Sequence, residues 1–200
     1  MADQYSGRWV AVVNIGFICE GYSELFILES LNFNEILKEL KLNCVGVINV
    51  KGNGNLLPRN IAIHRDNLFE LGAEKIFVLT DLDQDACITK TKERITEYEH
   101  QIIIIAVKQI EAWFLADSIT MNHIFKGDFN FDFPENEEVP FDSIRNLYFN
   151  KFQQGIVGRD EKKKLAKRML NNGFSIQNAA NHPNCPSAKY FLTKLQSIEI

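Results

Sequence analysis

The chain has 200 residues, of which 22 are Lys or Arg and 26 are Asp or Glu, so its formal net charge is −4. This length suits one domain with a modest extension. The hydrophobic fraction of 46% and the charged fraction of 24% exclude disordered and collagen-like chains. A mildly acidic chain does not bind nucleic acid through bulk charge, because such binding needs many phosphate contacts. Any nucleic acid must be held by a local basic patch or through metal ions.

The cysteines and histidines are scattered along the chain and include no Cys-x-x-Cys pair, which argues against a structural zinc site. The longest apolar stretch, residues 102–107, is far shorter than the roughly 20 residues of a membrane helix. Residues 1–8 hold no apolar run of the kind found in signal peptides. We therefore expect a cytoplasmic protein with reduced thiols and no membrane contact.

Strands and helices alternate in the first half of the chain. Segments rich in β-branched and aromatic residues predict strands at residues 9–19, 44–50, 75–80 and 101–107. Helical spacing predicts helices at residues 22–41, with a break near 32–34, at 58–72 and at 89–99. This order implies right-handed crossovers. The sequence therefore predicts an α/β fold with a mostly parallel sheet of four or slightly more strands, flanked by helices.

The second half changes in character. We expect the α/β domain to span residues 1–118 and an acidic connector containing Phe and Pro to span residues 119–142. Residues 143–200 are then a helical extension that packs on the same domain. Its predicted helices cover residues 144–152, 161–170 and 187–197, with Ser187 as the N-cap of the last.

Acidic side chains stand at the ends of three of the four predicted strands. They are Glu20 and Glu24 after the first strand, Asp81, Asp83 and Asp85 after the third, and Glu111 after the fourth. The carboxyl ends of parallel strands meet at one edge of a sheet, which is where ligands of open α/β folds bind. We therefore expect these carboxylates to converge on that edge.

Converging carboxylates raise one another's pKa unless a cation neutralises them. Hard oxygen ligands favour Mg²⁺ or Mn²⁺, so the cluster predicts a divalent-cation site. Ordinary structural roles are open as well. An Asp-x-Asp pair after a strand forms turns and caps helices, Glu20 favours the start of a helix, and Glu111 has the features of an ordinary helix residue.

Four short motifs follow one another in a recognisable order. They are Glu-Gly-x-x-Glu at residues 20–24, Asp-x-Asp at 81–83, Glu-Ala-Trp-Phe-Leu-Ala-Asp at 111–117 and Cys-Pro-Ser at 185–187. In the first two, the chain resembles the topoisomerase–primase (Toprim) catalytic domain, particularly that of overcoming-lysogenization-defect (OLD) type nucleases. With all four, it resembles an uncharacterised bacterial family of Toprim-like proteins more closely.

The resemblance implies nicking, cleavage or strand transfer of DNA or RNA with Mg²⁺ or Mn²⁺. It gives Glu20 the role of general acid/base or metal ligand, and it makes Asp81 and Asp83 the metal-binding pair. Glu24 and Asp85 match less regular acidic positions. Glu111 lies outside the core Toprim pattern, and we include it as a candidate ligand because of its place after the fourth strand.

A basic segment between residues 159 and 168 fits a nucleic-acid partner. Arg159, Lys163 and Lys167 from this segment, and Lys51 after the second strand, are the predicted phosphate contacts. The alternative is a solvated helix face, on which Asp160 and Glu161 oppose the positive charge.

Two other functions are compatible with parts of the pattern. In a haloacid-dehalogenase-type phosphatase Asp81 would be the nucleophile and Asp83 the general acid, although that fold normally carries the pair on its first strand. A non-catalytic Toprim-like subunit would instead bind a protein partner encoded in the same defence or toxin operon. Its acidic edge would bind metal weakly or not at all.

Overall fold

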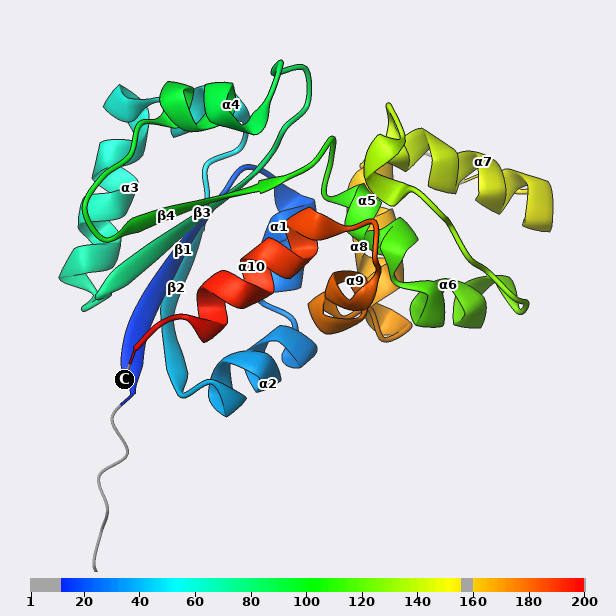
Figure 1. The fold of residues 1–200 in the computed structure, drawn as a ribbon, viewed down its shortest axis with the longest axis horizontal. Helices are drawn as coiled ribbons and strands as arrows, with labels where there is room; N and C mark the ends of the chain where they lie inside the picture. The colour runs from blue at the N-terminus through cyan, green and yellow to red at the C-terminus, as the bar shows by residue number, and fades with distance from the viewer. Residues whose placement is uncertain (1–11, 156–159, 200) are drawn as a thin grey trace, which may run out of the picture.

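The computed structural model describes residues 12–155 and 160–199, and these contain a four-stranded parallel sheet (Figure 1). The strands are β1 (Val13–Cys19), β2 (Leu42–Asn49), β3 (Lys75–Asp81) and β4 (Gln101–Ala106), in the spatial order β2-β1-β3-β4. Every neighbouring pair is parallel. The predicted α/β fold with a mostly parallel sheet is confirmed.

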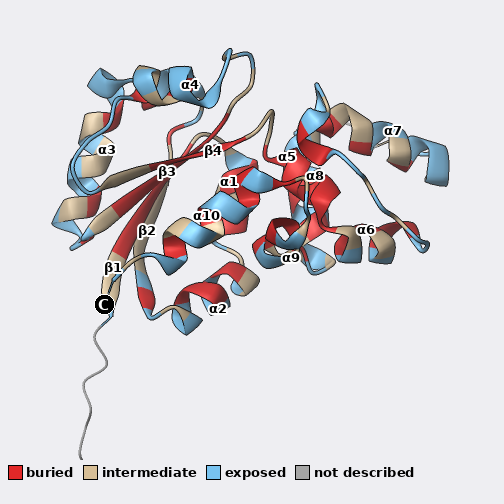
Figure 2. Ribbon diagram, viewed as in Figure 1, coloured by how far each residue is buried: buried red, intermediate tan, exposed pale blue. Residues whose placement is uncertain are grey.

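Alternate residues of the strands serve two separate hydrophobic clusters, because side chains along a strand point to opposite faces. On one face, Phe17 and Phe77 pack with α1 (Tyr22–Leu28), α2 (Leu31–Glu39) and α10 (Pro186–Gln196). On the other, Ile18 and Val78 pack with α3 (Pro58–Glu70) and α4 (Ile88–Ile95). Because helices cover both faces of the sheet, the strands are apolar almost throughout (Figure 2).

The chain after β4 is helical and joins the first of these clusters. Phe191 of α10 packs against rings from β1, α2, β3 and α5, namely Phe17, Phe33, Phe77 and Trp113. The helices of this part are α5 (Glu111–Ala116), α6 (Ser118–Phe125), α7 (Pro140–Phe152), α8 (Glu161–Asn171), α9 (Ile176–Asn181) and α10, with a short 3₁₀ turn at η2 (Pro134–Asn136). Another 3₁₀ turn, η1 (Asn53–Leu56), lies between β2 and α3.

Several local predictions need correction. The predicted break in the helix at 22–41 is present but lies at 29–30 rather than near 32–34, because Ser30 caps α2 by accepting a hydrogen bond from the Phe33 amide. Helix α4 ends at Ile95, and α7 begins at Pro140, inside the predicted connector. The helices α6 and α9 were not predicted.

Ser187 is not the N-cap of the last helix. Cys185 holds that position, and Ser187 lies within the first turn of α10. The Ser187 hydroxyl accepts a hydrogen bond from Trp113 Nε1 at 2.7 Å and donates one to the carboxylate of Glu135. The Cys-Pro-Ser motif therefore joins α10, α5 and the connector through a buried polar contact.

In the described part of the chain, no helix combines the length and the apolar character needed to cross a bilayer. All four cysteines are free thiols, and Cys19 and Cys185 are buried while Cys87 is exposed.

Candidate acidic site

A pocket of about 380 Å³ lies at the carboxyl ends of β1 and β3, between the start of α5 and the start of α8. We call it the acidic pocket. Four of the predicted ligands line it, Glu20, Glu24, Asp81 and Glu111, together with three lysines, Lys51, Lys162 and Lys163. The structure therefore brings together carboxylates from three strand ends, as the parallel topology predicts.

Glu20 follows β1 directly and is held against the end of β3. Its Oε2 accepts a hydrogen bond from Thr80 Oγ1 at 2.6 Å and a longer one from the Asp81 amide at 3.4 Å. Burial raises the pKa of Glu20 and the negative charge of Asp83 adds to the rise, while the Thr80 hydrogen bond opposes it. The two hydrogen bonds thus fix the carboxyl of Glu20 in position.

Asp81, the last residue of β3, connects the sheet to the helical half of the chain. Its side chain is buried, and Oδ1 accepts a hydrogen bond from the Ile110 amide at 2.7 Å. Ile110 is the N-cap of α5, so this bond places Glu111 at the pocket. Burial raises the pKa of Asp81 well above its ordinary value, and the negative charges of Glu24 and Glu111 raise it further.

Glu24 and Glu111 are the two most deeply placed acids of the pocket. Glu111 is fully buried, and its Oε1 accepts a hydrogen bond from Ser23 Oγ at 3.1 Å. Burial raises the pKa of Glu24 to about 8, and the charge of Glu111 adds to this rise. Gly21 lies against the same carboxylate, because a Cβ at that position would stand 3.0 Å from Glu24 Oε2.

Lys162 of α8 is the cation that reaches this cluster. Its Nζ lies 3.3 Å from Oε2 of Glu111, and its own side chain remains 46% exposed. Burial lowers the pKa of Lys162, but the charges of Glu111 and Asp81 outweigh it and raise the pKa overall. The sequence did contain a signal for this residue, since Lys162 stands three residues before the buried Leu165 and so shares its helix face.

The other two predicted ligands lie outside the lining of the pocket. Asp83 has a left-handed backbone (φ 46°), and its amide donates to the carbonyl of Lys108. Asp85 accepts hydrogen bonds from Thr91 Oγ1 and from Arg94, whose guanidinium lies 3.1 Å away in an ion pair. In this structure Asp85 therefore ties the β3–α4 loop to α4.

The predicted phosphate contacts fall on two elements. Lys51, after β2, lines the acidic pocket. On α8, Lys163 also lines it, with Nζ 3.8 Å from the ring centroid of Tyr22, and Lys167 follows with Nζ 5.0 Å from the ring centroid of Phe26. Arg159 lies outside the described residues. The basic face of α8 thus runs away from the acidic pocket along α1.

Within residues 12–155 and 160–199, no three His, Cys, Asp or Glu side chains stand close enough together to form a ready metal-binding group. The oxygen donors around the acidic pocket nevertheless match Mg²⁺ or Mn²⁺ in chemical type. Burial and repulsion between the carboxylates raise the pKa values of Glu24 and Asp81, and the nearby charge of Lys162 opposes the rise only in part. A small cation would fit the pocket in charge.

No protein-family model matches the chain, and no curated protein matches it. Among solved structures, the C-terminal region of the Burkholderia pseudomallei OLD protein is similar. It covers 94% of this chain and 100% of its own length, at 16% identity and a TM-score of 0.47. At this identity and TM-score the likeness assigns no role to any residue of this chain.

Proposed function

We propose that this protein is a Toprim-like nuclease that cleaves a phosphodiester bond of DNA or RNA in the acidic pocket with Mg²⁺ or Mn²⁺. The observation that supports this most directly is the burial of Glu24, Asp81 and Glu111 around one pocket. Buried like charges are costly, and a bound cation would remove that cost. The motif order noted in the sequence points to the same activity.

Glu20, Glu24, Asp81 and Glu111 are the side chains that would hold the ion. A bound divalent cation would polarise the phosphate and generate a nucleophilic water at neutral pH. Asp83 is not in the lining, but its charge raises the pKa of Glu20, so it belongs to the same electrostatic system.

The chain's own groups would orient and neutralise the substrate. The Thr80 hydroxyl fixes one oxygen of Glu20, which leaves the other free to exchange a proton with a reacting oxygen. Lys162 and Lys51 line the same pocket and would pair with phosphate oxygens. Lys163 and Lys167 would then hold the neighbouring phosphates along α8.

The decisive test combines metal binding with cleavage. We expect Mg²⁺ or Mn²⁺ to raise the melting temperature, since a ligand at 100 times its Kd stabilises the native state by about 2.7 kcal/mol. Asp81→Asn should abolish the rise, and Glu20→Gln should abolish cleavage while keeping the fold. The control is Asp66→Asn, an exposed acid on α3, which should behave as wild type.

A second candidate is the non-catalytic partner-binding subunit. The contact between Lys162 and Glu111 favours it, because a lysine in the acid cluster takes over part of the neutralisation that a metal would provide. The two candidates differ in the same experiment. If neither metal changes the melting temperature and the protein cleaves no single- or double-stranded DNA or RNA, the result would support the partner-binding subunit and contradict the nuclease proposal.

A further inference from the structure

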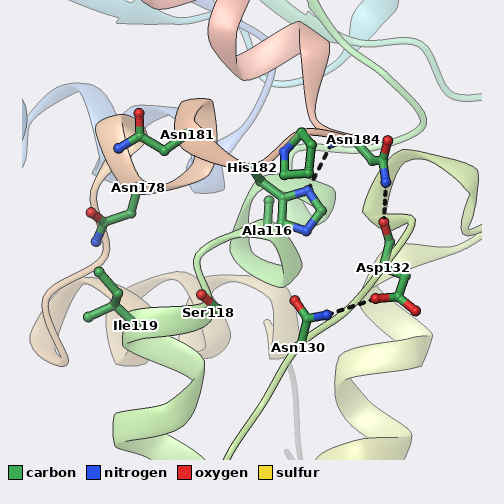
Figure 3. Close-up of a pocket in the computed structure, with 10 residues that line it drawn as sticks. Ala116, Ser118, Ile119, Asn130, Asp132, Asn178, Asn181, His182 and Asn184 are labelled. Atoms are coloured by element: carbon green, nitrogen blue, oxygen red, sulfur yellow. Dashed lines mark hydrogen bonds between the residues drawn. The ribbon is translucent and has the colours of Figure 1, made fainter.

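A second pocket, of about 330 Å³, lies at the other end of α5 from the acidic pocket (Figure 3). Glu111, the first residue of α5, lines the acidic pocket, and Ala116, the last, lines this one. The second pocket is built from the start of α6, the connector before η2, α9 and the loop that follows α9. Its lining is mostly amide and small polar groups: Ser118, Asn130, Asp132, Asn178, Asn181 and His182.

We call this second pocket the amide pocket. Hydrogen bonds fix several of its polar groups in defined orientations. Asn130 Nδ2 donates to Asp132 Oδ1 at 2.7 Å, and Asn184 Nδ2 donates to the Asp132 carbonyl at 2.7 Å. The backbone N–H of Asn184 also donates a hydrogen bond to His182 Nδ1 at 3.1 Å. Because His182 Nδ1 accepts this bond, the neutral ring carries its proton on Nε2 and presents a donor there.

The chemistry of the lining narrows the class of ligand. Among the residues that the structure describes, no lysine or arginine lines the amide pocket to neutralise a phosphate. An asparagine side chain pairs a donor with an acceptor, which is the pattern that reads the edge of a nucleobase. One N–H of Asn130, of Asn184 and of Asn178 is already used, the first two on Asp132 and the third on Asp117, so a ligand would meet their remaining N–H and carbonyl groups and the side chain of Asn181. Ile119 and the His182 imidazole offer surfaces against which a flat ring can lie. In Figure 3 the imidazole stands between the Asn130–Asp132 side and the Asn178–Asn181 side.

We propose that the amide pocket binds an uncharged nucleobase, either of a free nucleoside or of an unpaired nucleotide in a strand. Asp132 sets the preference among bases, because its second carboxylate oxygen favours a base that carries hydrogen-bond donors on its edge. Guanine has an amino group beside a ring N–H and satisfies this acceptor best. The proposal goes beyond nuclease activity and does not depend on it.

Saturation-transfer NMR with the full chain and free nucleosides tests the proposal. We expect guanosine to bind, and inosine, which lacks only the 2-amino group, to bind more weakly. Asp132→Asn should remove the preference for guanosine over inosine, and Asn181→Ala should weaken guanosine binding about tenfold, the equivalent of one lost hydrogen bond. The matched controls outside the pocket are Asp128→Asn and Asn150→Ala, which should bind as wild type.

A single-stranded oligonucleotide with one guanine, compared with the same strand carrying an abasic site, distinguishes the two sources of the base. Binding of the guanine strand without binding of guanosine assigns the pocket to nucleic acid, and binding of both assigns it to the base itself. The proposal is overturned if neither binds, if the pocket takes a monosaccharide instead, or if Asn181→Ala and Asp132→Asn both bind as the controls do. Because the readout is binding, a failure here leaves the metal and cleavage experiments unaffected.

Discussion

Glu24 and Asp81 are buried more deeply than carboxylates normally are without a cationic partner. Their exposed fractions are 4% and 7%. Burial is the largest cause of the raised pKa of each. Repulsion by Glu111 follows for Glu24, and repulsion by Glu24 and then by Glu111 follows for Asp81. Burial therefore favours the protonated form of both groups. Under the proposed function, protons and Mg²⁺ should compete at the acidic pocket.

The first residue-scale prediction is that the metal-free protein loses stability as pH rises. Folding raises the pKa of Glu24 from 4.5 to about 8, so its contribution is complete below pH 4.5 and is lost as the pH rises through about 8. Glu24→Gln cannot ionise, and above this window it should be more stable than wild type by on the order of 1–3 kcal/mol. Urea unfolding in a metal chelator at both ends of the window measures this.

The control for this experiment is Glu29→Gln, an exposed acid just after α1. It should leave the pH dependence of the free energy of unfolding unchanged. A wild-type protein whose stability is flat or rises through the window would contradict the burial argument.

Gly21 gives a second prediction at this scale. The φ of Gly21, −138°, suits alanine, but the new Cβ would stand 3.0 Å from Glu24 Oε2 and displace that carboxylate. Gly21→Ala should therefore weaken the metal-induced rise in melting temperature while changing the stability without metal by less than about 1 kcal/mol. Gly54→Ala, with open space around its Cβ, is the matched control. Equal metal responses in the two variants would count against Glu24 as a ligand.

At the scale of elements, α8 carries lysines on two faces, one toward Glu111 in the acidic pocket and one toward α1. Lys162 reaches Glu111 in the acidic pocket, and Lys163 and Lys167 lie over the rings of Tyr22 and Phe26 on α1. The rings hold the ammonium groups of Lys163 and Lys167 close to the surface of α1. This arrangement extends positive charge from the pocket mouth along the helix pair.

Salt dependence tests this role of α8. For a nucleic-acid strand bound to this face, Lys163→Ala and Lys167→Ala should each lower the slope of log K against log salt by about one unit, because each removes one phosphate contact. Lys189→Ala on α10, also an exposed lysine, should leave the slope unchanged. Fluorescence anisotropy over a salt series measures it. Identical slopes in all three variants would show that the α8 lysines are solvated and make no phosphate contacts.

The sequence predicted the elements whose signals are local. The strands are apolar because both faces of the sheet are covered. Glu20 directly follows β1 and Asp81 is the last residue of β3, so the parallel pairing of these strands brings the two side chains together. The short helices α6 and α9 were not predicted. Asp117 is a local N-cap of α6, because its carboxylate accepts a hydrogen bond from the Thr120 amide. The same carboxylate also accepts hydrogen bonds from Ser175 and Asn178 at α9, and these tertiary contacts leave no pattern in the residue spacing.

Long-range polar contacts account for the other differences. The pairing of Asp85 with Arg94 depends on how α4 leaves the sheet, which no spacing of residues reveals. Ser187 is of a residue type common at N-caps, yet its hydrogen-bond partners Trp113 and Glu135 lie far away in the chain. Lys162 differs from its lysine neighbours only in helix phase. Whether the six predicted ligands bind metal stays a prediction.

At the scale of the whole molecule, α10 completes the hydrophobic core that covers one face of β1. Phe191 is fully buried, and its ring lies 6.4 Å from that of Phe17 and 5.8 Å from that of Trp113. We expect Phe191→Ala to lower the free energy of unfolding by about 3–5 kcal/mol and to keep a single transition. Calorimetry and urea unfolding measure both quantities.

The neighbouring Tyr190, which is 39% exposed, is the control. Tyr190→Ala should cost far less, because its ring is not enclosed in the core. Two separate unfolding transitions in wild type or in Phe191→Ala would show that the sheet and the helical extension are independent units, contrary to their shared cluster.

The separation of Phe17 and Phe191 along the chain has a consequence for biosynthesis. β1 leaves the ribosome well before α10, so the ring that covers Phe17 is made long after its partner. Until α10 has emerged, nascent chains must expose the aromatic side of their sheet to the cell. Such chains are the species that chaperones bind and that aggregate when translation stalls.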